Sequence, residues 1–495
     1  MPYGPLMDRR QLLRTALAVT AGAAGAAALP STASAATSTI DPSRDFGAWQ
    51  GWGTSLCWWA NTFGDNDTVA DLFFSRKTVP YGGTNLPGLG LNIVRYNAGG
   101  SNWDPAGGET MKVSPNIPRF KQIQGYWRDW NSADPASASW NWYADAPQRN
   151  MMWKARDRGA DTFELFSNSP MWWMLYNHNP SGPDVKATEN LQNWNYRQHA
   201  VYLATIARYA HDHWGVDFTS VEPFNEPSGD WWTSQGTQEG CYAAPGVQRQ
   251  VIDHLRAELN ARDLWWMNVA APDDVTFDAA TWTWGQYPSA TRGNVGRINV
   301  HGYQYGNGRR DLLYNAAQAS GKPIWMSEYG EGDATGMSLA SNLNLDFRWL
   351  HPRAWVYWQV LDWSGWGLIQ CDGSTGWLGP VNTKYHVLAQ YTRHIRPGMR
   401  IIDSGDGNTV AAHDQNTGKL VVVVTNYGTG QYLDVELGKF GVRPGEGALV
   451  RRWATVTGGA ERYGYHEDTY IRGSRFWSWF EPNTVQTFEI DGVRK

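Results

Sequence analysis

Two short acidic segments contain residues whose types and positions could do acid–base chemistry. "VEPFNEPSGDWW" contains Glu222 and Glu226, and "PIWMSEYGEGD" contains Glu328 and Glu331. Each segment begins as an apolar run and ends in a Gly-containing turn, which predicts a β-strand that runs into a loop. Two carboxyl groups on either side of an acetal can cleave it: one protonates the leaving oxygen, and the other, ionised, meets the oxocarbenium-like carbon.

Eight apolar runs alternate with helical stretches between about residues 46 and 395, which is typical of a parallel α/β protein. The predicted strands are 52–59, 91–97, 161–168, 218–225, 265–272, 296–303, 323–329 and 354–361. Eight is the number of strands in a closed barrel, so we predict an α/β fold class with a (β/α)8 TIM barrel. The clearest helix is predicted at 190–212, where small and apolar residues recur on one face.

Position along a strand separates the acidic candidates, because reactive residues in such barrels lie at the carboxyl ends of the strands. Glu226 ends the fourth strand and Glu328 ends the apolar run of the seventh, so both are predicted at the barrel mouth. Glu222 lies four residues earlier, about 13 Å along the strand, and is predicted to be a hydrogen-bonded structural carboxylate. Glu331 follows Gly330 in a loop and is predicted to be a solvated charge at the rim.

The two ends of the chain differ from this pattern. After about residue 396, short strands separated by Gly/Asn/Asp turns predict a β-sandwich side domain over 396–495. The barrel is assigned to 36–395, and its first ten or so residues could join the side domain. Residues 1–35 contain Arg9-Arg10, an Ala-rich run and Ala33-Ser34-Ala35, which predict a twin-arginine signal peptide and a secreted, extracellular protein. A membrane anchor is disfavoured because the run is short and rich in Ala and Gly.

Charge and cysteine content exclude other classes of partner. The net charge is −5 with no basic run outside the N-terminus, so we expect no nucleic-acid partner and, after processing, no membrane partner. The three cysteines form no C-x-x-C motif and no His/Cys cluster that would indicate a metal. One pair could form a disulfide after export. The preferred pair is Cys241 and Cys371, since both lie in predicted loops.

Tryptophan is unusually abundant, at 30 residues. An indole face can stack on the C–H face of a sugar while its N–H reaches a hydroxyl, so this content favours a carbohydrate ligand. About half of the tryptophans at or just past predicted strand ends are expected to contact substrate and the rest to pack loops. They are Trp58, Trp59, Trp172, Trp173, Trp231, Trp232, Trp363 and Trp366.

The motifs also resemble a known enzyme family. "FNEP" and "SEYG" match the acid/base and nucleophile motifs of clan A retaining glycoside hydrolases. "GWGTSLCWWA" at 51–60, "RYNAGG" at 95–100 and the C-terminal β domain are similar to glycoside hydrolase family 30, most of all its bacterial endo-β-1,6-galactanase branch. The resemblance covers essentially the whole chain after the predicted signal peptide.

This resemblance implies roles for individual residues. Glu226 would be the acid/base and Glu328 the nucleophile, although the residues alone do not separate a retaining from an inverting geometry. Arg95 would keep the nucleophile ionised and Tyr303 would hydrogen-bond to it. Asn225 would bond the sugar 2-hydroxyl and Trp358 would lie under the attacked sugar. His301 is interpreted as a scaffold histidine that contributes from behind the reacting groups. Trp59, Trp173 and Trp232 are substrate-binding candidates because they lie at or just past predicted strand ends. For Arg95 the alternative is a structural ion pair, and for Tyr303 and Trp358 it is a place in the core.

The function implied is a secreted, monomeric, retaining endo-glycosidase that hydrolyses β-1,6-galactan, such as arabinogalactan side chains. Its partner would be the polysaccharide or an oligosaccharide, and neither a metal nor an organic cofactor is needed. One alternative is the same mechanism on β-1,6-glucan, xylan or β-glucosides, because no residue reports the configuration of a single hydroxyl. The other is a catalytically inactive glycan-binding protein, although such a protein has no use for a pair of strand-end carboxylates.

Overall fold

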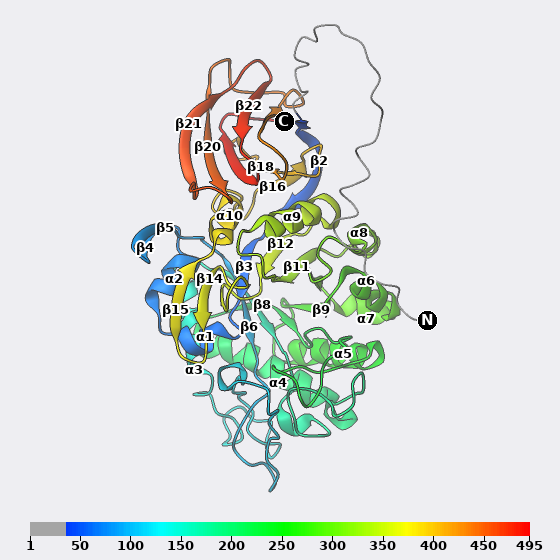
Figure 1. The fold of residues 1–495 in the computed structure, drawn as a ribbon. Coiled ribbons are helices and arrows are strands. Elements are labelled where there is room, and N and C mark those ends of the chain that lie inside the picture. The colour runs from blue at the N-terminus through cyan, green and yellow to red at the C-terminus, as the bar shows by residue number, and fades with distance from the viewer. Residues whose placement is uncertain (1–35) are drawn as a thin grey trace, which may run out of the picture.

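The computed structural model describes residues 36–495, and the predicted signal peptide lies outside the described residues. Eight parallel strands close into a barrel in the order β10-β11-β12-β3-β6-β7-β8-β9 (Figure 1). The strands are β3 (Gly51–Ser55), β6 (Ile93–Asn97), β7 (Thr162–Phe166), β8 (Phe218–Glu222), β9 (Asn268–Asp274), β10 (Arg297–His301), β11 (Ile324–Tyr329) and β12 (Ala354–Tyr357). Each lies within or overlaps one of the eight predicted strands, so the TIM barrel prediction is confirmed.

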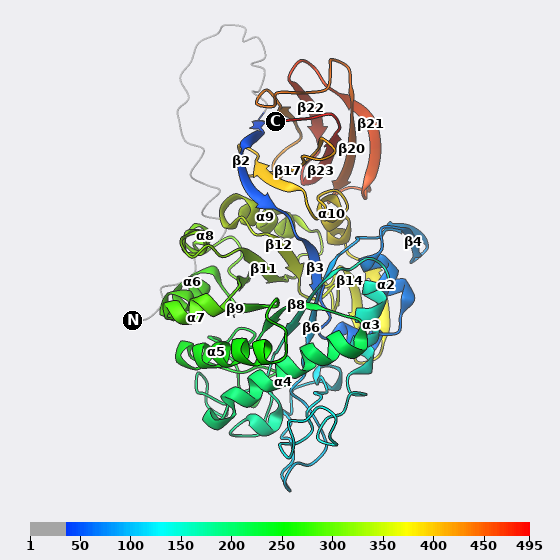
Figure 2. The same cartoon turned by 180° about the vertical axis from the view of Figure 1, so that it is seen from behind.

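The barrel strands are buried on both faces, which is why they appear in the sequence as continuous apolar runs without alternation. Helices cover the outside of the barrel, with α4 and α5 side by side in Figure 2. The helices are α1 (Trp59–Phe63), α2 (Asp67–Phe74), α3 (Ala146–Arg156), α4 (Tyr196–Tyr209), α5 (Pro245–Ala261), α6 (Phe277–Gln286), α7 (Ser289–Asn294), α8 (Arg310–Ala319), α9 (Met337–Leu345) and α10 (Thr383–Thr392). Short strands in the loops are β4 (Thr78–Tyr81), β5 (Thr84–Pro87), β13 (Leu361–Asp362), β14 (Ile369–Asp372) and β15 (Trp377–Val381).

Helix α4 begins six residues later than predicted. Asn190 and Gln192 are engaged with the preceding loop instead: the carbonyl oxygen of Asn190 accepts from the Tyr176 N–H at 2.7 Å, and the Gln192 N–H donates to Met174 at 3.0 Å. These bonds hold the chain extended up to the helix start. The predicted apolar face, from Ala200 to Ala210, is buried.

The C-terminal domain consists of two sheets that share one apolar core, with Ile40, Val422, Phe476 and Phe488 among its buried members. The larger sheet has the order β2-β16-β17-β18-β23-β20-β21 and the smaller β1-β19-β22. Their strands are β1 (Ala36–Thr39), β2 (Asp41–Ala48), β16 (Arg400–Asp403), β17 (Thr409–Asp414), β18 (Lys419–Asn426), β19 (Gln431–Glu436), β20 (Leu449–Val456), β21 (Gly464–Tyr470), β22 (Arg475–Phe480) and β23 (Thr484–Ile490). This confirms the predicted side domain.

Helix α10 connects the two parts of the molecule. Gln390 donates to Thr455 Oγ1 at 2.9 Å, and its carbonyl oxygen accepts from Thr487 Oγ1 at 2.7 Å. Strands β1 and β2, at the N-terminal end of the described chain, pair with β19 and β16 of the C-terminal domain. The side domain is thus bound to the barrel through both a helix and an N-terminal strand pair.

Two further sequence expectations concern cysteines and membranes. Cys57, Cys241 and Cys371 are all free, buried thiols, so the predicted Cys241–Cys371 pairing is wrong. All three are buried, and Cys371 lies in β14 rather than in a loop. Among residues 36–495, the helices are too short or too polar to cross a membrane.

Candidate active site

Glu226 lies in the loop that follows β8, not in the strand itself. The strand ends at Glu222 because Pro223 has no N–H to donate to a sheet ladder. Glu226 adopts a left-handed backbone conformation with φ of 47°. Its N–H donates to Asp273 O at 3.0 Å, and its carbonyl oxygen accepts from the Trp232 indole at 2.9 Å. These two bonds fix the turn that presents the Glu226 carboxyl group to the cleft.

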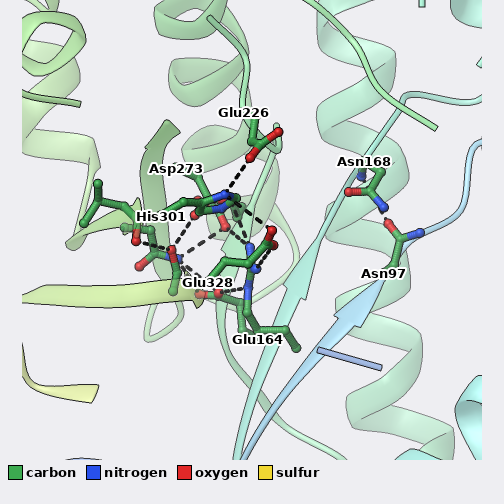
Figure 3. Close-up of polar contacts among 12 residues, drawn as sticks. Asn97, Glu164, Asn168, Glu226, Asp273, His301 and Glu328 are labelled. Carbon is green, nitrogen blue, oxygen red and sulfur yellow. Dashed lines mark hydrogen bonds and ion pairs between the residues drawn. The ribbon is translucent and has the colours of Figure 1, made fainter. Parts of the chain in front are cut away.

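Glu328 is the penultimate residue of β11 and points toward Glu226 (Figure 3). Its Oε2 accepts from Arg95 Nη1 at 3.0 Å, and its Oε1 accepts from the Tyr303 hydroxyl at 2.8 Å. The side chain is almost completely buried. The structure therefore brings together the predicted nucleophile and the two residues expected to keep it ionised and oriented.

His301, the last residue of β10, lies between the two glutamates (Figure 3). Its Nδ1 is 3.0 Å from Glu226 Oε1 and 3.5 Å from Glu328 Oε1, and its Nε2 is 2.9 Å from Asp273 Oδ2. A carboxylate oxygen of each glutamate and a ring nitrogen of His301 all lie within 4.8 Å of one another. The imidazole therefore contacts both glutamates directly.

Within residues 36–495, one cluster of acidic and histidine side chains is compact enough to surround a metal ion. It consists of Glu226, His301 and Glu328. Burial opposes the charged imidazolium, but the carboxylates of Asp273 and Glu328 raise the pKa of His301 well above its ordinary value. The protonated form that this favours carries hydrogen on both ring nitrogens, with Nδ1 hydrogen-bonded to Glu226 and Nε2 in an ion pair with Asp273, so that neither offers a lone pair to a metal. The group is suited to proton transfer rather than metal binding.

Arg95, on β6, is fully buried beneath the glutamate pair and contacts four carboxyl groups. Besides Glu328, these are Glu164 at 3.0 Å, Glu222 at 2.8 Å and Asp273 at 2.9 Å. Arg95 is therefore both a structural ion-pair partner and a direct contact of Glu328. Glu222 is a hydrogen-bonded carboxyl group of the scaffold, as predicted from its position in the strand.

Charge is distributed unevenly among these carboxyl groups. Burial and the neighbouring Asp273 and Glu164 raise the pKa of Glu222 well above its ordinary value, against the opposing charge of Arg95, which favours the neutral form of Glu222. Burial also acts on Asp273, but His301 and Arg95 hold its pKa below the ordinary value. Burial raises the pKa of Glu328 to about 7, opposed by His301 and Arg95 and assisted by Glu226 and Asp273. The glutamate pair therefore holds a proton at weakly acidic pH.

Glu226, Tyr303 and Glu328 line an open cleft of about 630 Å³. Its aromatic walls are formed by Trp58, Trp231, Trp232, Trp358 and Trp366. The Trp358 ring meets the Trp58 ring edge to face at 5.1 Å, which fixes one wall. A groove with indole faces beside two polar reacting groups fits a sugar chain, since each ring has an apolar face and a polar edge.

Trp59 and Trp173 do not line this cleft. Trp59, in α1, is buried and donates its indole N–H to Ser55 O at 2.7 Å. Trp173 donates to Trp127 O at 2.9 Å and packs against the Trp127 ring at 5.1 Å. The expectation that these two contact substrate is corrected: the tight turns after β3 and β7 direct both indoles into the interior. Trp232 lines the cleft and also holds the Glu226 backbone.

Two other positions differ in their surroundings from what the sequence suggested. Asn225 is buried and its N–H donates to Ser167 O at 3.0 Å, while its side-chain oxygen has no hydrogen-bond partner among the described residues. Glu331 is not a solvated rim charge: it is 7% exposed and pairs with Lys384 Nζ at 2.7 Å. The Lys384 side chain comes from α10, a partner that local sequence does not reveal.

Asp273 is the main site residue that sequence reasoning missed. It lies near the carboxyl end of β9 and contacts Arg95, His301 and, at 2.6 Å, the Ser327 hydroxyl. The strand-end criterion that selected Glu226 and Glu328 would also have selected it. Lys121, Gln359 and Asp362 line the cleft from loops, where no comparable signal exists.

Comparisons with known proteins agree with this geometry. The model of O-Glycosyl hydrolase family 30 matches residues 33–277. The chain is 52% identical to an endo-β-1,6-galactanase of Hypocrea rufa, over 92% of this chain and 95% of that protein. That relative is fungal, which corrects the bacterial branch that the motifs suggested.

Solved structures share the fold at low sequence identity. A conserved exported protein from Bacteroides fragilis superposes with a TM-score of 0.73 at 17% identity, covering 92% of this chain and all of that one. A glycoside hydrolase family 30 subfamily 8 xylanase from Clostridium acetobutylicum superposes with a TM-score of 0.65 at 20% identity, covering 92% of this chain and 99% of that one. The solved structures agree in fold, and the family match and the 52% identical fungal relative show that the chain belongs to glycoside hydrolase family 30.

Proposed function

We propose that the protein is a retaining endo-β-1,6-galactanase. The observation that carries the mechanism is the closeness of the glutamate pair, since one carboxylate oxygen of Glu226 lies within 4.8 Å of one carboxylate oxygen of Glu328. Retaining glycosidases hold their two carboxyl groups about 5–5.5 Å apart, whereas inverting enzymes hold them about 6.5–9.5 Å apart to admit a water. The short distance supports direct attack on the sugar by one of the two glutamates.

In the first step, a Glu328 carboxylate oxygen attacks the anomeric carbon while Glu226 gives its proton to the leaving oxygen. The glycosidic bond breaks and a glycosyl ester forms on Glu328. Arg95 and Tyr303 both donate hydrogen bonds to Glu328, which favours its ionised form and orients it. Glu226 receives no such pair of donors, and we assign it the role of the acid.

In the second step, the ionised Glu226 takes a proton from a water molecule, whose oxygen attacks the anomeric carbon. The ester bond breaks and Glu328 leaves as a carboxylate, so two inversions give net retention. His301, 3.0 Å from Glu226 Oε1, stabilises Glu226 while it is ionised between the two steps. Asp273 holds the other imidazole nitrogen and keeps His301 in position.

The pH dependence follows from the proton that the pair shares. We expect kcat/KM to fall as pH rises through about 7, because above the raised pKa of Glu328 the free enzyme loses this proton and cannot protonate the leaving oxygen. A kcat/KM profile measured from about pH 4 to pH 9, with folding followed by circular dichroism, checks this. A profile that stays level or rises up to about pH 9 would contradict the shared proton.

Replacing Glu226 with alanine should lower kcat/KM on galactan by about 10²–10⁴-fold, the usual contribution of general acid catalysis. An aryl galactoside with a good leaving group needs little protonation, so formation of its glycosyl ester should lose much less. Burst kinetics on both substrates would measure the two losses. Equal losses of rate on the two substrates would contradict the role of Glu226 as the acid.

The substrate assignment rests on the 52% identical relative, which is an endo-β-1,6-galactanase, and the open cleft fits attack within a chain. Side chains of arabinogalactan would supply such linkages. The same chemistry on β-1,6-glucan, xylan or β-glucosides is the alternative, because galactose and glucose differ only in the configuration of one hydroxyl and the glutamate pair does not read that difference.

The substrate is tested by a product profile on de-arabinosylated arabinogalactan beside β-1,6-glucan and xylan. Galacto-oligosaccharides, with no products from the other two polymers, are the expected result. Products from glucan or xylan alone would overturn the substrate while leaving the mechanism in place. Binding of galactan without any hydrolysis would instead indicate an inactive glycan-binding protein.

A further inference from the structure

The smaller sheet of the C-terminal domain presents tryptophans to solvent. Along β22, Phe476, Ser478 and Phe480 are buried, whereas Trp477 and Trp479 are 44% and 45% exposed. This strand lies within the red part of the side domain in Figure 1. Two large indoles on the solvent face of one strand leave much apolar area uncovered, which is typical of a surface that binds another molecule.

Tyr432 of β19 extends this row. It lies opposite Trp479 in the strand register, the two ring centroids are 5.2 Å apart, and Tyr432 is 55% exposed. Residues two apart on a strand are about 7 Å apart on the same face. Trp477, Trp479 and Tyr432 therefore form an aromatic platform long enough for more than one sugar ring.

A groove of about 490 Å³ runs beside the aromatic platform. Its other walls are mostly polar and come from the larger sheet and adjoining loops. The groove is lined by the three rings of the platform and by Arg452, Val456, Glu461, Asp468, Thr469, Ser478, Glu481, Thr484 and Gln486. Aromatic faces are thus combined with hydroxyl, amide and carboxylate groups in one depression.

The charges in this groove indicate a neutral ligand. Both oxygens of Asp468 accept from the Arg452 guanidinium. Glu461 and Glu481 each use one oxygen, for His466 and Trp479, and keep the other for a ligand hydroxyl, while their charge repels anionic chains. Phosphate-bearing polymers and acidic peptides are therefore disfavoured. A neutral polyhydroxylated chain satisfies the carboxylates while its sugar rings stack on the indoles.

The two indole N–H groups differ in availability. Trp479 Nε1 donates to Glu481 Oε1 at 2.9 Å, which fixes that ring. Within residues 36–495, Trp477 Nε1 has no hydrogen-bond partner, so it is available to a ligand hydroxyl. The catalytic cleft uses the same combination, indole faces such as Trp231 and Trp366 beside carboxylates.

We propose that this groove is a second glycan site, which binds a stretch of the same neutral β-1,6-galactan that the cleft hydrolyses. The identity of the ligand rests on the proposed function, whereas the existence of the site rests on the aromatic platform and groove. A chain held at the side domain has a raised effective concentration at the cleft. Only polymers long enough to reach both sites gain from it, so short oligosaccharides are hydrolysed at an unchanged rate.

The test is affinity electrophoresis in gels that contain β-1,6-galactan, in a Glu328→Gln background that leaves the polymer intact. Adding Trp477→Ala and Trp479→Ala is expected to weaken galactan binding about tenfold, since each ring supplies a stacking contact. Trp477→Phe with Trp479→Phe retains aromatic faces and should recover most of the binding. An alanine double variant that is folded and binds galactan as tightly as its parent would overturn the proposal.

Matched controls separate this inference from the proposed function. Trp265→Ala removes an indole that is 72% exposed on the barrel and should leave galactan binding unchanged. With Glu328 intact, the alanine double variant should hydrolyse a short galacto-oligosaccharide within twofold of the wild-type rate. Hydrolysis of galactan with binding independent of both tryptophans contradicts this inference alone. Galactan that is bound through them but never cleaved contradicts the proposed function alone.

Discussion

Replacing Glu328 with alanine is expected to lower kcat/KM on β-1,6-galactan by about 10⁴-fold or more, because the variant cannot form the glycosyl ester. Azide fits the space left by the carboxylate and should restore turnover of an aryl galactoside. A single displacement would then give the α-glycosyl azide. In a Glu226→Ala variant the ester still forms on Glu328, so azide should give the β-glycosyl azide. Interchanged azide products would reverse the two roles.

The matched control is Glu222→Gln, in the same segment as Glu226. Because the raised pKa of Glu222 favours its neutral, hydrogen-bonded form, the amide is a close replacement in shape and charge. Activity within about tenfold of the wild type is expected, since no charge is removed. A loss as large as that of Glu328→Ala would mean that Glu222 takes part in the proton transfers.

Replacing Arg95 with methionine should give the largest loss of stability. Four carboxyl groups, those of Glu164, Glu222, Asp273 and Glu328, would lose their common cation inside the barrel. Breaking a buried ion pair by removing one partner costs about 3–5 kcal/mol, because the remaining charge stays buried and uncompensated. Urea unfolding should show a loss of this size, and any folded fraction should have low activity because Glu328 takes up a proton more readily.

Arg309→Met is the comparison for this variant. Arg309 pairs with Asp311 at the surface, where water already solvates both charges, so no measurable change in unfolding is expected. Equal stability of the two variants would show that the carboxyl groups around Arg95 adjust by taking up protons at little cost. If Arg95→Met lost activity but no stability, Arg95 would act only through its contact with Glu328.

Much of the scaffold could be predicted from local sequence. The barrel strands are buried on both faces, so each appears as an apolar run bounded by turn residues, and position within a run separated Glu222 from Glu226. The residues at which the strands end were predicted less accurately. Pro223 ends β8 before Asn225, so Glu226 reaches the cleft from a left-handed turn and not from the strand.

The environment of the site depended on long-range contacts that no local pattern encodes. Glu331 is buried because Lys384 reaches it from α10, and Asp273 became part of the site through Arg95 and His301. Long-range contacts also place adjacent tryptophans in different environments. Trp58 lines the cleft while Trp59 packs inside, a difference set by the turn after β3 and by the core that surrounds it.

The stereochemistry of the first-formed product tests the central claim most directly. Proton NMR during the first minutes of hydrolysis of a β-1,6-galacto-oligosaccharide distinguishes the two anomers of the new reducing end before they interconvert. Two displacements through Glu328 predict that the β-anomer appears first and the α-anomer later, by mutarotation. Initial release of the α-anomer would show a single inversion and contradict a nucleophilic Glu328.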